Sequence, residues 1–213
     1  MNRINLVILG CIGVSLFFWF FGVNMPVDEY FAFSWNNLVK GRFWTVVTAL
    51  FLHADIAHLA GNMLFLYVFG NTLENELKSA KTLSAFFAGG IIAFILSTFF
   101  YSPSDYMIGA SAAIFTLTAI VMLVKPLKFS FAFMMPQGLV AILYFAYNIL
   151  MVYFGEESNV AYISHVIGFV IGLAFGAVWS KNLARNLLIT LGLFLIYGVI
   201  TLLVIPQLVH AIL

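Results

Sequence analysis

Two residue types that together perform nucleophilic catalysis lie in strongly apolar parts of this chain. Ser111 lies in the small-residue cluster Gly109-Ala110-Ser111-Ala112, and His165 lies in a separate apolar segment. A histidine in a membrane-spanning helix is costly, which makes it a candidate functional residue. A serine hydroxyl becomes a nucleophile when a neutral imidazole accepts its proton. The pair therefore predicts acyl-transfer chemistry, provided that the fold brings the two side chains together.

The composition places these residues in a membrane protein. Of the 213 residues, 64% are apolar and only 8% are charged, and a soluble domain with that balance could not present a polar surface. We therefore expect an all-α polytopic membrane protein, with one domain over residues 1–213 embedded in the lipid bilayer. A net charge of +1 argues against nucleic acid as a partner. The single cysteine, Cys11, cannot form an internal disulfide and is interpreted as a small buried residue.

Seven apolar segments are candidate membrane spans. The first contains about 20 residues, which span about 30 Å as a helix and exceed the apolar core of a signal peptide. A polar and aromatic stretch at 24–57 follows it, and we expect that stretch to lie at the membrane interface. The predicted spans are 4–23, 58–77, 82–101, 111–124, 136–154, 160–179 and 186–208.

The distribution of charge predicts the orientation. If the N-terminus is cytoplasmic, the inner segments contain seven of the nine Lys and Arg residues, and six of the eight acidic residues lie outside. This is a clear positive-inside bias. We expect a multi-pass protein of the plasma membrane whose C-terminus, after seven spans, lies outside. The inner cations are Arg3, Lys78, Lys81, Lys125, Lys128, Lys181 and Arg185.

The segment 111–124 is too short to cross the whole membrane. Its 14 residues span about 21 Å, and Lys125-Pro126 ends it at the inner face. In a hydrocarbon core of about 30 Å, Ser111 then lies about 9 Å below the outer surface. Residues 102–110 must descend to it as non-helical chain, which is tolerated at that depth only around protein or a water-filled cavity.

Three other polar side chains reach a similar depth from the outer side. Counted from the outer ends of their segments, His165 lies about 8 Å deep and Asn62 about 7 Å deep. His58 lies near the outer end of the same segment as Asn62. No acidic residue is well placed beside His165, so we predict a Ser–His dyad rather than a triad. The side chains of Asn62 and His58 and the free backbone N–H of Ser111 are candidate oxyanion donors.

Small and aromatic residues support a close meeting of the two segments. Gly168, Gly172 and Gly176 repeat every four residues, a pattern that allows helix backbones to approach closely. Phe115, four residues after Ser111, is placed to stack on the imidazole. Taken singly, each of these residues also fits simple helix packing, and their occurrence at one depth is what favours a reactive site.

Three motifs resemble the rhomboid family of intramembrane serine proteases over about residues 40–180. His53-xxxx-His58-xxx-Asn62 is similar to the family's HxxxxHxxxN, Gly109-Ala110-Ser111 to the start of GxSG, and His165-xx-Gly168-xxx-Gly172 to AHxxGxxxG. The resemblance implies a six-helix rhomboid-like bundle, about 4–179, followed by one extra C-terminal helix, about 186–208.

The resemblance also implies an activity, namely hydrolysis of peptide bonds in transmembrane protein substrates without a cofactor or metal. It makes Ser111 the nucleophile and His165 the base. His58, Asn62 and Gly109 serve the oxyanion site, with Phe115, Gly168 and Gly172 in support. The chain departs from the family pattern at three places: Ala112 replaces a glycine, Ser164 replaces an alanine, and the Trp-Arg pair of the first loop is present only as Trp44-Thr45. We expect the Ala112 methyl group to narrow the substrate pocket.

Two alternatives remain at this point. A non-catalytic rhomboid-like protein that binds membrane clients would be expected to lack the serine or the histidine, and both are present. A metal site or transporter built on His53, His58 and His165 is disfavoured, because the five-residue step between the first two is poor for one helical face and no acid joins them.

Overall fold

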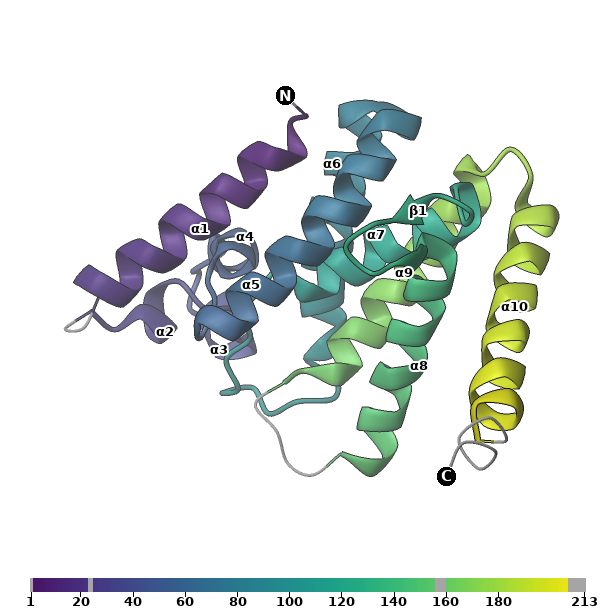
Figure 1. Cartoon of the computed structure of the whole chain (residues 1–213). Helices are drawn as coiled ribbons and strands as arrows, with labels where there is room; N and C mark the ends of the chain where they lie inside the picture. Colours follow the sequence, from purple (N-terminus) through teal and green to yellow (C-terminus); the bar gives the residue numbers. More distant parts are fainter. Residues whose placement is uncertain (1, 23–24, 156–159, 207–213) are drawn as a thin grey trace.

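The structure, a computed structural model, describes residues 2–22, 25–155 and 160–206. Within these residues, five helices are long and apolar enough to cross a membrane. This confirms the expected all-α polytopic bundle (Figure 1). The five are α1 (Ile4–Phe21), the bent helix Ile56–Ser97, α8 (Gln137–Phe154), α9 (Tyr162–Trp179) and the C-terminal helix Leu183–Leu203.

The bent helix contains two of the predicted spans. It consists of α5 (Ile56–Phe65), the π-helical turn η2 (Leu66–Gly70) and α6 (Asn71–Ser97). The chain reverses within α6 at Lys78, whose backbone has φ of 71° and is not helical. The predicted span 82–101 ends at Ser97 rather than at residue 101, because residues 98–100 form turns.

The short helix α7 (Ser111–Val124) lies at the centre of the bundle and has the bounds predicted from the sequence. Every residue from Ala112 to Leu123 is buried, and α6, α8 and α9 pack around it (Figure 1). A helix that is apolar on all sides is expected to be buried, either in the core of a protein or in lipid, and α7 is buried in the protein. Enclosure on all sides fixes the position of its first residue, Ser111.

Glycines set the spacing between α7 and α9. A Cβ atom added at Gly168 would overlap the carbonyl oxygen of Ala112, and one added at Gly172 would overlap the carbonyl oxygen of Thr116. The Thr116 hydroxyl donates a hydrogen bond of 2.8 Å to the carbonyl oxygen of Gly168. The two helices are therefore held at backbone contact, as the repeat of small residues predicts.

The N-terminal region forms a layer of short helices beside α1. They are α2 (Val27–Tyr30), α3 (Trp35–Val39), α4 (Thr45–Thr48) and the 3-10 turn η1 (Ala49–Phe51). Arg42 joins this layer through a 2.6 Å ion pair with Glu29. At the other end of α1, the Glu74 carboxylate accepts hydrogen bonds from the backbone N–H groups of Arg3 and Ile4, at 2.7 and 2.8 Å. It therefore satisfies donors that the first helical turn leaves unpaired.

Residues 102–110, which lead to Ser111, are non-helical as expected, and backbone hydrogen bonds hold this part of the segment 98–110. Phe33 and Met107 form an isolated antiparallel bridge, with N···O distances of 3.1 and 2.7 Å. The N–H of Gly109 donates to the carbonyl oxygen of Ala49 at 2.8 Å. The part of the segment next to α7, at Met107, Gly109 and Ala110, is therefore buried in protein, which is the condition for irregular chain at that depth of a membrane, whereas residues 102–106 are exposed.

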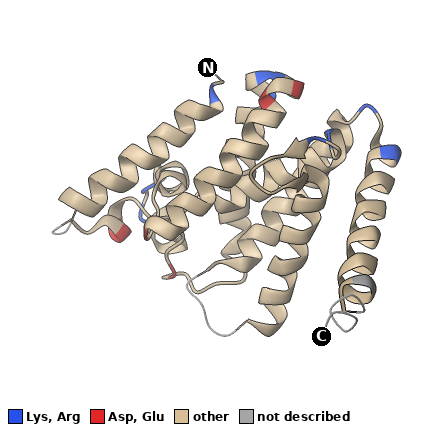
Figure 2. Cartoon of the chain, viewed as in Figure 1, with Lys and Arg blue, Asp and Glu red and all other residues tan. Residues whose placement is uncertain are grey.

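The remaining elements lie at the other end of the bundle. A two-stranded hairpin of β1 (Phe129–Ser130) and β2 (Met135–Pro136) connects α7 to α8. After α9, α10 (Leu183–Val199) and the π-helical turn η3 (Ile200–Val204) form the extra helix, which begins three residues before the predicted start. Residues 207 and 208 of the predicted helix lie outside the described residues. Figure 2 shows Lys and Arg gathered at the end where α1 begins, α6 bends and α10 begins.

Candidate active site

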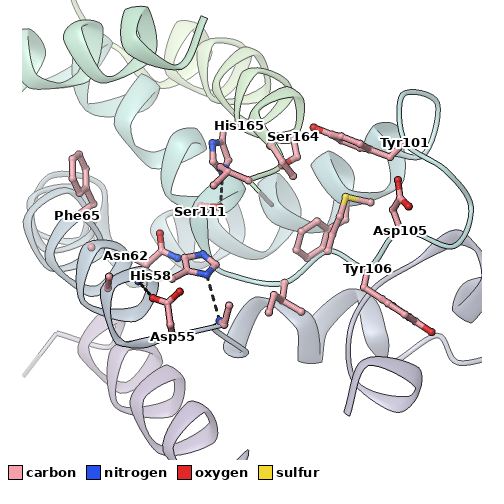
Figure 3. A pocket seen from close by; sticks show the side chains of 18 of the residues that line it. Asp55, His58, Asn62, Phe65, Tyr101, Asp105, Tyr106, Ser111, Ser164 and His165 are labelled. Carbon is pink, nitrogen blue, oxygen red and sulfur yellow. Dashed lines mark hydrogen bonds between the residues drawn. The ribbon is translucent and has the colours of Figure 1, made fainter. Parts of the chain in front are cut away.

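The fold brings Ser111 and His165 into hydrogen-bonding contact. Ser111 is the first residue of α7, and His165 lies in the first turn of α9. The distance between Ser111 Oγ and His165 Nε2 is 2.7 Å (Figure 3). His165 is only 7% exposed. The contact between α7 and α9 through Gly168, one turn further along α9, allows two short side chains from separate helices to meet.

A third polar side chain, which the sequence reasoning missed, completes a chain of hydrogen bonds. Asn148 on α8 is 1% exposed, and its Oδ1 lies 2.8 Å from His165 Nδ1. Its Nδ2 donates a 2.9 Å hydrogen bond to the carbonyl oxygen of Tyr162. The search for a third member considered only acidic residues. A lone asparagine among the apolar residues of 137–154 was the available signal, because polar groups inside membrane helices need a partner.

An aromatic stack holds the imidazole from one side. Phe115 lies parallel to the His165 ring, with 4.7 Å between ring centroids and 12° between planes, and this is the position expected for it. The stack continues beyond Phe115. Tyr144 stacks on Phe115 with 4.3 Å between ring centroids, and Phe65 stacks on Tyr144 at the same distance of 4.3 Å. The histidine therefore has little freedom to rotate away from Ser111.

Polar donors lie on the opposite side of Ser111. Asn62 is 6% exposed, and its Nδ2 has no hydrogen-bond partner among the described residues. His58 Nδ1 lies 3.5 Å from the backbone N–H of Ala54, which leaves Nε2 directed toward Gly109. A buried amide donor without a partner is costly, and a negatively charged oxygen at this place would satisfy it.

Gly109 makes room for this arrangement. Its φ is +107°, which side-chain-bearing residues rarely adopt, and an added Cβ would lie 2.7 Å from His58 Nε2. Glycine is therefore required both by the backbone turn and by the close approach of the His58 ring. The turn delivers the chain to the start of α7, where the N–H of Ser111 has no acceptor within the helix.

Ser111, His165, His58 and Asn62 line one cavity of about 840 Å³. Its volume is in the range of sites that bind small molecules or short peptide segments. Tyr101, Asp105 and Tyr106 from the segment 98–110 form another part of its wall (Figure 3). The Tyr101 hydroxyl accepts a 3.2 Å hydrogen bond from the N–H of Ile163, and burial raises the pKa of Tyr101.

Neither of the nearby loop acids reaches the histidine. The Asp55 carboxylate accepts from the His58 N–H at 2.8 Å and caps α5, and the Asp105 carboxylate accepts from the Ser102 N–H at 2.9 Å. Both satisfy local backbone donors. The residue that bonds the second imidazole nitrogen is the amide of Asn148.

Two of the departures from the rhomboid motif lie outside the cavity lining or at its edge. The Ala112 side chain is 1% exposed within α7, so it cannot contact a molecule in the cavity. The expectation that its methyl group narrows the pocket is therefore wrong, because Ala112 is not among the residues that line the cavity. Ser164 lines the cavity but is 2% exposed, and its hydroxyl donates to the carbonyl oxygen of Ala161 at 2.6 Å.

His53 serves a separate buried contact. Its Nδ1 lies 3.1 Å from Ser15 Oγ on α1, and its ring meets that of His58 edge to face at 5.0 Å. Burial, reinforced by the neighbouring His58, lowers the pKa of His53 to about 4. In the part of the chain that the structure describes, no three His, Cys, Asp or Glu side chains form a group suited to a metal ion.

Comparisons with known proteins agree with this architecture. The rhomboid domain matches residues 40–182. The chain is 41% identical to Rhomboid protease GluP of Bacillus subtilis over 81 residues, and 33% identical to the chloroplastic Rhomboid-like protein 11 of Arabidopsis thaliana over 124 residues. These alignments cover 38% and 58% of this chain but only 16% and 42% of the two relatives.

A third relative is matched over more of the chain. The identity to Rhomboid protease GlpG of Yersinia pseudotuberculosis is 24% over 189 residues, which cover 84% of this chain and 63% of that protein. The chain thus spans less than two thirds of the length of each of these relatives. The domain match extends over more than half of the chain, and it includes Ser111, His165 and the residues of the site around them. The chain belongs to the rhomboid family.

Proposed function

We propose that this protein is an intramembrane serine endopeptidase that cleaves peptide bonds in or near the transmembrane segments of other membrane proteins. The single observation that carries the proposal is the 2.7 Å contact between Ser111 Oγ and His165 Nε2 at the cavity wall. In this proposal Ser111 is the nucleophile and His165 is the general base and acid. No cofactor or metal is needed for this chemistry.

The proposed reaction follows from the positions of the protons. His165 Nε2 accepts the hydroxyl proton as Ser111 Oγ attacks the carbonyl carbon of the scissile bond. When the tetrahedral intermediate collapses, the imidazolium protonates the leaving amine, and an acyl-serine remains. A water molecule from the cavity then attacks the ester with the same imidazole as base, which releases the acid product and restores the serine.

The oxyanion of the intermediate needs donors that are already in place. We propose Asn62 Nδ2, His58 Nε2 and the Ser111 N–H, since these lie around the site on the side away from His165. Gly109 supports them by leaving space for the His58 ring. Donors fixed before the reaction stabilise the developing charge without reorganisation.

The proposed substrates are transmembrane proteins. A helical substrate has its carbonyl groups in internal hydrogen bonds, so helix-breaking residues near the cleaved bond would free the backbone for attack. The chain is a multi-pass membrane protein, and the family match ends at residue 182, directly before α10 begins at Leu183. We propose one rhomboid domain over 1–213, with α10 as an addition to the core.

We propose that the protein lies in the plasma membrane with the N-terminus in the cytoplasm and the C-terminus outside. The support is the excess of Lys and Arg at the end of the bundle opposite the site (Figure 2). In this orientation Ser111 faces the outer side. Substrates would then be cut near their outer ends.

Cleavage of a single-span model substrate in liposomes tests the proposal. Wild-type protein should cleave it, and Ser111→Ala should not. Equal cleavage by both proteins would refute the nucleophile. A second function, binding of membrane clients without catalysis, is the outcome if neither protein cleaves any of a panel of such substrates but both retain them through purification.

A further inference from the structure

The side-chain amide of Asn148 has only one orientation that satisfies its surroundings. It lies on α8, is 1% exposed and contacts two groups. The carbonyl oxygen of Tyr162 can only accept a hydrogen bond, so the amide nitrogen of Asn148 must face it at 2.9 Å. The amide oxygen, Oδ1, then faces His165 Nδ1 at 2.8 Å. The reversed amide would place two acceptors against each other at Tyr162.

This orientation determines where the histidine carries its proton. Because Asn148 Oδ1 is an acceptor, His165 Nδ1 must be the protonated nitrogen that donates to it. A neutral imidazole has only one N–H, so Nε2 carries a lone pair, and this lone pair points at the Ser111 hydroxyl at 2.7 Å. The hydrogen bonds therefore run from Ser111 to His165, then to Asn148, and end on Tyr162.

We propose that Asn148 is a positioning residue that fixes His165 in the Nδ1–H tautomer and so makes it the base for Ser111. The proposal rests on the proposed function, since it assigns a role within that site. It replaces the expected dyad by a Ser–His–Asn arrangement in which the third member is neutral. An asparagine orients the ring and fixes the tautomer, but it stabilises the imidazolium less than a carboxylate would.

A second buried asparagine shows what a purely structural role looks like. Asn186 on α10 is 4% exposed, and its Nδ2 donates to the carbonyl oxygens of Leu123 and Val124 at 2.8 and 3.2 Å. It joins α10 to the end of α7, far from the cavity that contains Ser111, and it contacts no titratable group of the site. Asn148 differs in one respect, because its oxygen bonds an imidazole.

Among the residues that the structure describes, the titratable groups around His165 do not provide another partner for Nδ1. The described titratable groups that line the same cavity are Asp28 on α2, Asp55 and His58 at the start of α5, Tyr144 on α8, and Tyr101, Asp105 and Tyr106 in the segment 98–110. Tyr162 on α9 meets the ring edge to face at 6.1 Å. Asp105 and Tyr101 bond backbone groups. Without Asn148 the Nδ1–H would lose its acceptor, and the tautomer with the proton on Nε2 would become accessible.

The test measures the tautomer directly and the reaction separately. In protein with ¹⁵N-labelled histidine, the two ring nitrogens of His165 give distinct chemical shifts for N–H and bare nitrogen, and His165→Gln identifies the signals. We expect wild type to show a protonated Nδ1. Asn148→Leu should show a mixture of tautomers, with kcat reduced at least about 10-fold and KM little changed. Asn186→Leu, the matched control, should lower thermal stability and leave tautomer and kcat unchanged.

Asn148→Asp keeps an acceptor of the same size and adds a negative charge. It should retain the Nδ1–H tautomer and most of the activity, and the acid limb of its pH–rate profile should move to higher pH by about one unit. This variant keeps the test decisive if Asn148→Leu fails to fold. The proposal is overturned if Asn148→Leu retains the wild-type tautomer and kcat, or if Asn148→Asp loses both activity and tautomer. If instead wild type and Ser111→Ala are equally inactive, the proposed function fails while the tautomer result still stands.

Discussion

The two ends of the contact between α7 and α9 differ in chemistry although the helices run side by side. At the end where both helices begin, polar side chains meet across the interface, with Ser111 Oγ 2.7 Å from His165 Nε2. Further along, Gly172 lies against the backbone of Thr116, and Gly176 lies against Leu123. One end therefore provides the proposed reactive groups, and the other provides only contact.

The packed end of the interface sets the distance between Ser111 and His165 at the polar end. A serine and a histidine on neighbouring helices reach each other only if the backbones are in contact, and the glycines allow that contact. The reactive end in turn cannot hold the helices together, because its polar groups border a cavity of about 840 Å³. Changes at the polar end should therefore reduce activity with little effect on stability, whereas changes at the packed end should reduce both.

The largest effect is expected from a change at the polar end. His165→Ala should reduce cleavage of a single-span substrate by at least about 10³-fold, because the serine loses its base. Thermal unfolding in detergent should change far less than cleavage. A variant that is inactive because it has unfolded would contradict the separation of the two ends.

A change at the packed end should reduce both quantities. Gly172→Val places side-chain atoms on the backbone of Thr116, so α9 must move away from α7. We expect a loss of about 1–3 kcal/mol in stability and about 100-fold in activity, since displacement of the base by about 1 Å is costly. Gly192→Val is the matched control, because an added Cβ there meets nothing within 4 Å. Full activity in Gly172→Val would show that the glycines do not position His165.

The oxyanion side should give an intermediate effect. Asn62→Ala removes one of three proposed donors, and we expect kcat to fall by about 100-fold or less with the stability maintained. Because the Nδ2 of Asn62 has no partner among the described residues, its removal leaves no broken hydrogen bond behind. A loss as complete as that of His165→Ala would assign Asn62 a larger role than that of one donor.

The smallest effect on activity is expected at His53, which lies behind His58 and contributes to the dependence of stability on pH. Burial lowers the pKa of His53 to about 4 in the folded state, against an ordinary value of 6.5. The unfolded chain therefore binds a proton between these values and the folded chain does not, so the stability is complete above pH 6.5 and falls as the pH decreases toward 4. At pH 5 the expected loss is about 2 kcal/mol.

Thermal unfolding of wild type and His53→Gln at pH 7 and pH 5 measures this contribution. The glutamine variant should show a smaller decrease in unfolding temperature on acidification, because residue 53 no longer titrates in this range. An identical decrease in both proteins would exclude His53 as a source of the acid sensitivity.

Much of the bundle could be predicted from periodicity, length and charge. The bounds of α7 followed from the small-residue cluster before Ser111 and from Lys125-Pro126 after it. The reversal at Lys78 lay between two predicted spans, but its backbone, with φ of 71°, has no clear sequence signal. The three short helices of the N-terminal layer were expected only as an interfacial stretch, because elements of four or five residues are defined by tertiary contacts rather than by periodicity.

For the site, residue types and spacing were enough to select Ser111, His165, His58 and Asn62, because each is polar within an apolar segment. They were not enough to select Asn148. Its role depends on which face of α8 meets α9, and the apolar surroundings of 137–154 do not define a single face. The position of the Ala112 methyl group was mispredicted for the same reason, because neighbours in sequence point in different directions on a helix.

Covalent labelling of the serine tests the central claim most directly. A fluorophosphonate reacts only with a serine that is activated by a base, so wild-type protein in liposomes should be labelled, and mass spectrometry should locate the adduct on Ser111. Ser111→Ala and His165→Ala should not be labelled, and Gly192→Val should be labelled as wild type is. Absence of labelling in active wild-type protein, or equal labelling of Ser111→Ala, would contradict the account.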